Sequence, residues 1–117
     1  MLIPIQQNLI IYQGSSFTHT WHITDANDVD IDLTNFIIRM QIRKSYNSKV
    51  ILDLDNLTKL GIRILHSPNT MIDLYLTPEQ TQLIKTDCIY DIELEDTLGD
   101  VIRFIQGNIT ISKEVTQ

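Results

Sequence analysis

The chain has 117 residues, of which 43% are hydrophobic, and a formal net charge of −6. This length fits one domain, and the apolar fraction is sufficient for a core without disulfides or metal ions. The nine lysine and arginine residues are scattered, whereas nucleic-acid binding depends mainly on clustered positive charge. The composition therefore argues against a nucleic-acid partner.

Membrane and redox roles are not indicated by the sequence either. No apolar run is long enough to span a bilayer, and the start lacks the pattern of a signal peptide. We therefore expect a soluble protein made in a cytoplasm, without a membrane partner. The lone Cys88 lies among alternating apolar positions, which predicts a small buried hydrophobe and not a catalytic thiol.

Residues 1–7 (MLIPIQQ) are short and apolar. Pro4 lacks the amide that a central strand needs, so this segment is predicted to be an edge strand or an extended arm. Such an arm packs either on its own domain or on a neighbouring molecule, which makes Leu2, Ile3 and Ile5 candidate interaction residues. A β-branched strand over 8–12 follows and ends at the turn formers of 13–16.

The segment 17–24 (FTHTWHIT) alternates two kinds of side chain. Its apolar parity places Trp21 in the core as an anchor. The opposite parity carries Thr18, Thr20 and His22, a polar face that could meet a partner. His19 and His22 point to opposite faces of a regular strand, so they cannot share a metal ion.

The acidic segment 25–33 (DANDVDIDL) would project several aspartates from one side if it were extended. Counted from Asp25, however, the positions that an EF-hand loop gives to glycine and glutamate hold Asp30 and Phe36. We therefore interpret the segment as a solvated acidic turn, and no metal ligand is assigned in the chain.

The middle of the chain predicts further strands and one helical turn. Strands are expected over 36–43, which alternates clearly and belongs near a sheet centre, and over 50–54, followed by a hairpin of 61–65 and 70–76. Thr77, Pro78 and Gln80 form an N-terminal capping box, so a short helix is expected over about 77–84. It should carry Leu83 and Ile84 onto the core.

Two final strands are predicted over 88–95 and 101–112, joined by a turn at Gly99. Tyr90 occupies the place of a tyrosine corner, whose hydroxyl bonds backbone a few residues upstream and which Leu83 would share. The acidic side chains Asp91, Glu93 and Glu95 project from one wet face and are candidate interaction residues. The apolar phase changes along the last strand, which predicts a bulge or a sheet crossing at Gln106–Gly107 and makes Gly107 structural.

Short strands with turns every 8 to 12 residues predict an all-β fold, an immunoglobulin-like antiparallel β-sandwich of seven to eight strands with one short helical turn. An open barrel of the same strands is the alternative. The predicted organisation is an arm or edge strand over 1–7, a sandwich domain over 8–112 and a C-terminal tail over 113–117, in which Val115 is a candidate interaction residue.

No catalytic motif accompanies this fold. The sequence contains no serine elbow, no glycine-rich loop before a helix and no cysteine or histidine group with metal spacing. We therefore expect a protein that is not an enzyme, with no catalytic residue and no cofactor. The carboxylates of the 88–95 strand are better explained as a solvated face than as a glycosidase pair.

Several stretches, taken in order, resemble a family of small structural proteins of tailed-bacteriophage particles, similar to the N-terminal domain of baseplate upper proteins. These stretches are Tyr12–Phe17 (YQGSSF), Asp32–Phe36 (DLTNF), Arg39–Arg43 (RMQIR), Leu76–Thr81 (LTPEQT), Tyr90–Leu94 (YDIEL), Gly99–Arg103 (GDVIR) and Gln106–Thr116 (QGNITISKEVT). The chain departs from the family pattern at Ser15, where aspartate is common, and at Asn35, where glycine is common.

This resemblance implies a structural part of a virion, located in the tail, baseplate, neck or fibre attachment and assembled in the host cytoplasm. Its partners would be other virion proteins and further copies of itself in a symmetric ring. It transfers no active site. The alternative from the residues is a sandwich that binds a carbohydrate or a receptor, for which Tyr46 and Tyr75 are the exposed aromatic candidates.

Overall fold

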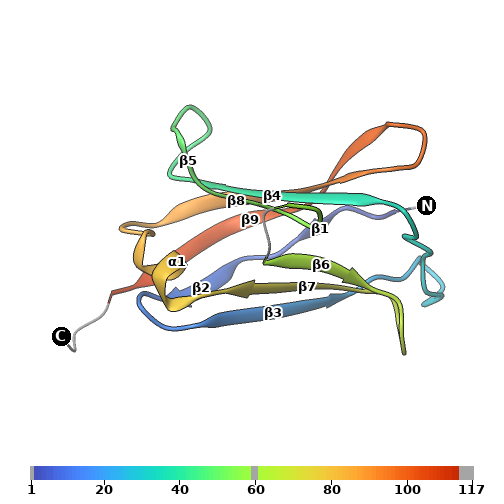
Figure 1. Cartoon of the computed structure of the whole chain (residues 1–117), viewed down its shortest axis with the longest axis horizontal. Coiled ribbons are helices and arrows are strands. Elements are labelled where there is room, and N and C mark those ends of the chain that lie inside the picture. The colour runs from blue at the N-terminus through green and yellow to red at the C-terminus, as the bar shows by residue number, and fades with distance from the viewer. Residues whose placement is uncertain (1, 59–60, 114–117) are drawn as a thin grey trace.

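The computed structural model describes residues 2–58 and 61–113. Within these residues the chain forms nine strands and one short helix, arranged as two sheets packed face to face (Figure 1). The elements are β1 (Ile5–Gln6), β2 (Leu9–Tyr12), β3 (Phe17–His22), β4 (Ile37–Arg43), β5 (Val50–Asp55), β6 (Ile62–Leu65), β7 (Met71–Leu76), α1 (Pro78–Gln82), β8 (Cys88–Glu95) and β9 (Val101–Ser112).

The larger sheet has the order β1-β9-β8-β4-β5, with β2 also paired to β9, and the smaller sheet has the order β3-β7-β6. Strands β1 and β2 run parallel to β9, and every other paired neighbour is antiparallel. Variable-type immunoglobulin domains divide their strands between two sheets in this way. The predicted immunoglobulin-like β-sandwich is therefore confirmed, with nine strands among the described residues instead of the predicted seven to eight, and the open barrel is excluded.

The core lies between the two sheets and follows the predicted alternation. The larger sheet contributes Ile38, Met40 and Ile42 from β4, and Tyr90, Ile92 and Leu94 from β8. Trp21 on β3 is 5% exposed and faces them from the smaller sheet. Side chains of a strand alternate between its two faces. The residues that lie between these buried positions on β4 and β8 therefore point to the outer face of the larger sheet.

Helix α1 begins with the predicted capping box, in which the Thr77 side chain accepts from the Gln80 amide and the Gln80 side chain accepts from the Thr77 amide. The buried hydroxyl of Thr81 accepts from the Gly14 amide at 3.0 Å and donates to the Ser15 carbonyl at 2.9 Å. The helix is thereby fastened to the turn after β2. The prediction for Leu83 is wrong, because its side chain is 55% exposed, whereas Ile84 is buried as expected.

The alternation of apolar and polar side chains along β9 shifts by one residue, as predicted, but the predicted position of this shift is wrong. Ile92 pairs with Ile105 and Glu93 pairs with Arg103, so Phe104 is the extra residue of a bulge. Phe104 and Ile105 are both buried, although they are neighbours. The bulge lets two consecutive apolar side chains reach the core, and the strand stays within one sheet through Gln106 and Gly107.

The predicted tyrosine corner at Tyr90 is also wrong, because the hydroxyl of Tyr90 does not bond backbone in its own neighbourhood. It donates instead to the carbonyl of Gln7 at 2.5 Å, in the segment that links β1 to β2. Burial raises the pKa of this phenol, so the hydroxyl stays protonated and can donate. Tyr90 remains structural: it fastens the N-terminal segment to the sheet.

Gly107 lies directly opposite Tyr90 in the β8–β9 pairing. A Cβ atom at this position would stand 1.9 Å from the Gln7 carbonyl oxygen, which is far inside contact distance. The prediction that Gly107 is structural is confirmed for a reason that the sequence does not reveal, namely the close passage of the N-terminal backbone.

The β8–β9 turn is closed as predicted. The Asp96 amide donates to the Asp100 carbonyl at 2.9 Å, and the Asp96 carboxylate accepts from the amides of Leu98 and Asp100. Gly99 adopts a positive φ of 92°, the conformation for which glycine is favoured. Among the residues the structure describes, no helix has the length and apolar character needed to cross a membrane.

Candidate functional site

The outer face of the larger sheet, which we call the polar face, carries the most organised set of polar side chains. One row runs straight across the sheet in register, with Gln6 beside Gln106, Gln106 beside Asp91 and Asp91 beside Gln41. The next row places Arg103 beside Glu93 and Glu93 beside Arg39. Side chains in such rows are direct neighbours, because cross-strand Cβ atoms stand about 5 Å apart.

The acidic triplet predicted from the sequence lies on this face, but it does not form a negative patch. Arg39 donates to Glu95 at 3.2 Å, and Arg103 stands 3.6 Å from Asp91. Glu93 is flanked in register by the same two arginines. Each predicted acidic residue therefore has a cationic neighbour, although β5 adds Asp53 beside Gln41 and Asp55 beside Arg39 to the same face.

A groove of about 380 Å³ is hollowed into the polar face. The residues that line it come from β1, β4, β8, β9 and the β4–β5 turn: Gln6, Gln41, Arg43, Tyr46, Ile89, Tyr90, Asp91, Glu93, Arg103, Gln106, Gly107 and Asn108. Figure 1 shows the β4–β5 turn and the β8–β9 hairpin both bending away from the smaller sheet, so that the polar face lies between them.

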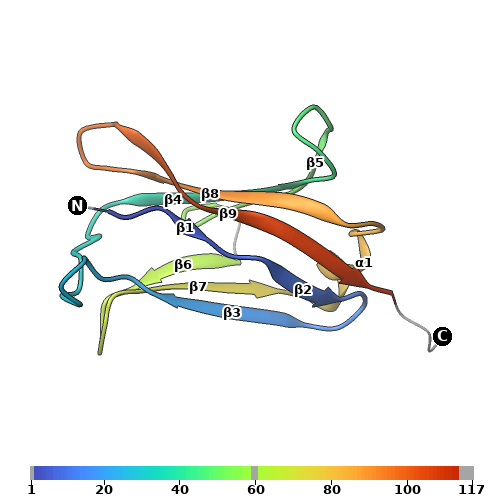
Figure 2. The ribbon, with the colours of Figure 1, turned by 180° about the vertical axis from the view of Figure 1, so that it is seen from behind.

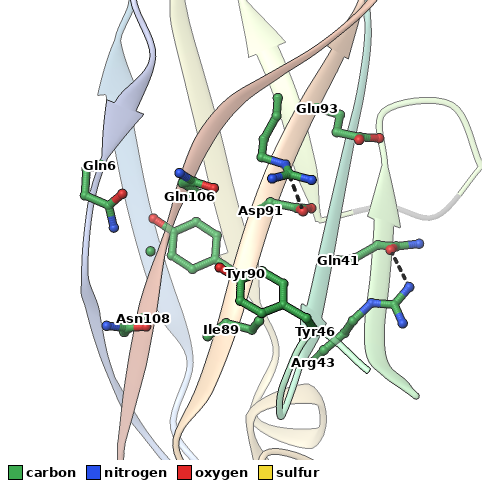
Figure 3. A pocket seen from close by; sticks show the side chains of 12 residues that line it. Gln6, Gln41, Arg43, Tyr46, Ile89, Tyr90, Asp91, Glu93, Gln106 and Asn108 are labelled. Carbon is green, nitrogen blue, oxygen red and sulfur yellow. Dashed lines mark hydrogen bonds and ion pairs between the residues drawn. The ribbon is translucent and has the colours of Figure 1, made fainter. Parts of the chain in front are cut away.

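The exposed aromatic side chain at the groove is Tyr46, which is 78% exposed, whereas Tyr90 is buried. Figure 3 shows its ring extending from the β4–β5 turn toward β8. Arg43 is held at the base of that turn, because its guanidinium donates to the Ser48 carbonyl at 2.7 Å and to the Gln41 side chain at 3.0 Å. The groove thus combines an exposed ring with fixed polar groups.

The outer face of the smaller sheet carries the other predicted polar residues, Thr18, Thr20 and His22, all exposed on β3. Thr20 donates to Asp73 at 2.9 Å. His22 stands 2.9 Å from Asp30, whose pKa is lowered by the amide of Thr70 and by His22 itself. The contacts of Asp30 with His22 and with the Thr70 amide fasten the acidic segment to the smaller sheet, whereas the Thr20–Asp73 contact joins β3 to β7.

Among the described residues, no three His, Cys, Asp or Glu side chains lie close enough together to hold a metal ion. His19 lies on the opposite side of β3 from His22, with its ring centroid 4.4 Å from that of Trp21. In the acidic segment, Asp28 has a positive φ and Asp30 and Asp32 bond different backbone amides, so these aspartates do not converge. The Cys88 thiol is buried, and burial raises its pKa.

The N-terminal candidates divide between core and surface. Leu2 and Ile5 pack against the core, whereas Ile3 is half exposed. The N-terminus lies at the same end of the sandwich as the β8–β9 hairpin in both views (Figures 1 and 2). That hairpin exposes Leu98 and Val101. Val115, the candidate in the tail, lies outside the described residues.

Sequence reasoning found the carboxylates of the polar face but missed its amides. Gln6 lies on β1, Gln41 on β4, and Gln106 and Asn108 on β9, three strands that only the order of the sheet brings together. Their outward parity was visible in the sequence, but the pairing of the first strand with the last was not.

Comparisons with known proteins find distant structural similarity and no family. No family model matches the chain, and no curated protein gives a significant match. Among solved structures, the chain is similar to part of an endo-fucoidan hydrolase of glycoside hydrolase family 107, with 12% identity and a TM-score of 0.48 over 94% of this chain. This chain spans only 13% of that hydrolase.

Two immunoglobulin-like structures are similar over most of both chains. The ZIG-8–RIG-5 IG1–IG1 heterodimer has 9% identity and a TM-score of 0.47, covering 93% of this chain and 84% of that one. Murine CRIg has 7% identity and a TM-score of 0.39, covering 92% of each chain. Likenesses this distant carry no argument about function.

Proposed function

We propose that this protein is a non-enzymatic structural component of a tailed-bacteriophage particle, which acts by docking onto other virion proteins and onto copies of itself. The proposal rests on the resemblance of the chain, from Tyr12 onward, to small phage structural proteins. Its location would be the virion, and a symmetric ring is the expected form of self-association.

The observation that carries the proposal is the role of the residues that make up the resemblance. Gly14 and Thr81 fasten the β2–β3 turn to helix α1. Tyr90 and Gly107 hold the N-terminal segment beside β9. These residues maintain the shape of a rigid sandwich, which an assembly module needs.

The end of the sandwich that carries the N-terminus is the best candidate for docking. Ile3, Leu98 and Val101 expose large apolar side chains there, and Leu98 is 87% exposed at the hairpin tip. Exposed apolar side chains gathered at one end are a common mark of protein–protein contact. Partner subunits that cover this end would remove them from water.

Leu98→Asp tests this docking end. A charge placed at a buried contact is costly to desolvate, so we expect the substitution to weaken self-association by more than about tenfold, as measured by sedimentation equilibrium. The free energy of unfolding should stay unchanged, because the side chain is exposed in the single chain.

Leu83→Asp is the matched control, since Leu83 is also an exposed leucine but lies by α1 at the opposite end. It should leave association unchanged. Equal weakening by both substitutions, or a wild-type protein that stays monomeric throughout the concentration range, would contradict docking of copies through the N-terminal end.

A further inference from the structure

We propose that the groove on the polar face is a binding site for a short neutral oligosaccharide. This inference goes beyond the assembly role and does not depend on it. It rests on the charge balance of the groove, on unengaged amide side chains that line it, and on the exposed ring of Tyr46.

The charges at the groove exclude a strongly ionic ligand. Arg43 and Arg103 are opposed by Asp91 and Glu93, and Arg103 already stands 3.6 Å from Asp91. An anion entering the groove would approach two carboxylates, and a cation would approach two guanidinium groups, so each would gain little net attraction. A neutral polar molecule is repelled neither by the carboxylates nor by the guanidinium groups.

The amides supply the hydrogen bonds that such a molecule needs. Within residues 2–58 and 61–113, the side chains of Gln6, Gln106 and Asn108 form no hydrogen bond, although each amide offers one acceptor and two donors. The neighbouring carboxylate of Asp91 adds acceptors in the same row. A sugar hydroxyl both donates and accepts, so adjacent hydroxyls can be satisfied by an amide and a carboxylate side by side.

Tyr46 supplies the apolar contact. Its ring extends over β8, where the half-buried Ile89 adds a further apolar surface to the groove (Figure 3). The C–H face of a pyranose is apolar and flat, and it packs on an aromatic ring while the sugar hydroxyls point to the sides. The volume of about 380 Å³ lies within the range of small-ligand sites.

A peptide is a poorer fit for the same groove. An extended peptide is recognised mainly by the free backbone groups of an edge strand, and the groove is centred on β8 and β9, which are both paired on either side. Side chains alone would have to hold the peptide. We therefore assign the groove to a saccharide.

The test is a titration of the ¹⁵N-labelled protein, followed by ¹H–¹⁵N correlation spectra. The probes are trisaccharides of glucose, galactose, mannose, rhamnose and N-acetylglucosamine, with trigalacturonate as the anionic comparison. At least one neutral trisaccharide should give saturable shifts at Gln41, Asp91, Gln106 and Asn108. Trigalacturonate should bind more weakly than that sugar.

Tyr46→Ala should weaken binding of the same trisaccharide by about tenfold or more. Tyr75→Ala is the matched control, because Tyr75 is exposed on the outer face of the smaller sheet, and it should leave binding unchanged. Gln106→Ala should also weaken binding, and it keeps the test independent of any change in the β4–β5 turn. The proposal is overturned if no neutral probe shifts the groove residues, if trigalacturonate binds better, or if neither Tyr46→Ala nor Gln106→Ala weakens binding.

Discussion

Replacing Gly107 with alanine is expected to lower the free energy of unfolding by about 3 kcal/mol or more. The added methyl would stand 1.9 Å from the Gln7 carbonyl oxygen and 2.6 Å from its carbon. Both atoms belong to the backbone, so relief requires the segment between β1 and β2 to move away from β9. Urea unfolding followed by tryptophan fluorescence measures the loss.

Movement of that segment would also break the bond from Tyr90 to Gln7. Tyr90→Phe alone should cost about 1–2 kcal/mol, and in the Gly107→Ala background it should cost almost nothing more, because the bond is already lost. Thr110→Ala, at an exposed position on the same strand, is the control and should cost under about 1 kcal/mol. Fully additive costs of the first two substitutions would show that Gly107 and Tyr90 do not hold the same segment.

Trp21→Ala is expected to lower the free energy of unfolding by about 3–5 kcal/mol, the usual cost of truncating a large aromatic in a core. Trp21 is 5% exposed, pairs across the smaller sheet with Ile72 and packs its ring against that of His19. Removal of the ring would leave a cavity between the two sheets. Circular dichroism during urea unfolding measures the change, since the variant lacks the only tryptophan.

Trp21→Phe separates packing from hydrogen bonding at this site. The Trp21 Nε1 atom is buried and finds no hydrogen-bond partner among the described residues. A buried donor without a partner costs about 1–3 kcal/mol, and phenylalanine removes this donor while it keeps much of the apolar surface. The Phe variant should therefore be clearly more stable than the Ala variant. A cost below about 1 kcal/mol for Trp21→Ala would contradict its role as a core anchor.

Local patterns account for the strands that sequence analysis predicted. The alternation of residues 36–43 and 88–95 placed Met40, Tyr90 and Ile92 in the core, because a strand with one wet face needs a period of two. The capping box at Thr77 and the glycine turn at Gly99 involve residues at most four apart. Such short-range chemistry is visible before any fold is known.

The features that were missed depend on contacts between distant parts of the chain. Tyr90 bonds a carbonyl 83 positions away, and no local pattern identifies that partner. The bulge at Phe104 does have a signal, since Phe104 and Ile105 are consecutive apolar residues, but the glycine two positions later was the stronger cue. That glycine is required instead by the close passage of the Gln7 backbone, in the segment that links β1 to β2.

The polar face was only half predictable for the same reason. Asp91, Glu93 and Glu95 share a parity on one strand, so their common face follows from the sequence alone. Their arginine neighbours and the amides of Gln6 and Gln106 arrive from other strands, through pairings that the fold creates. The acidic stripe that the sequence predicted is thus interleaved with arginine and amide side chains in the structure.

The role in a phage particle is the central claim, and gold labelling of purified particles tests it most directly. Antibodies raised against this protein would be applied to tailed-phage particles from a lysate of the strain that encodes it, and the label would be located by electron microscopy. The proposed function predicts gold at one fixed position of the tail, baseplate, neck or fibre attachment. Particles that carry no label, with the protein left wholly in the soluble fraction of the lysate, would contradict it.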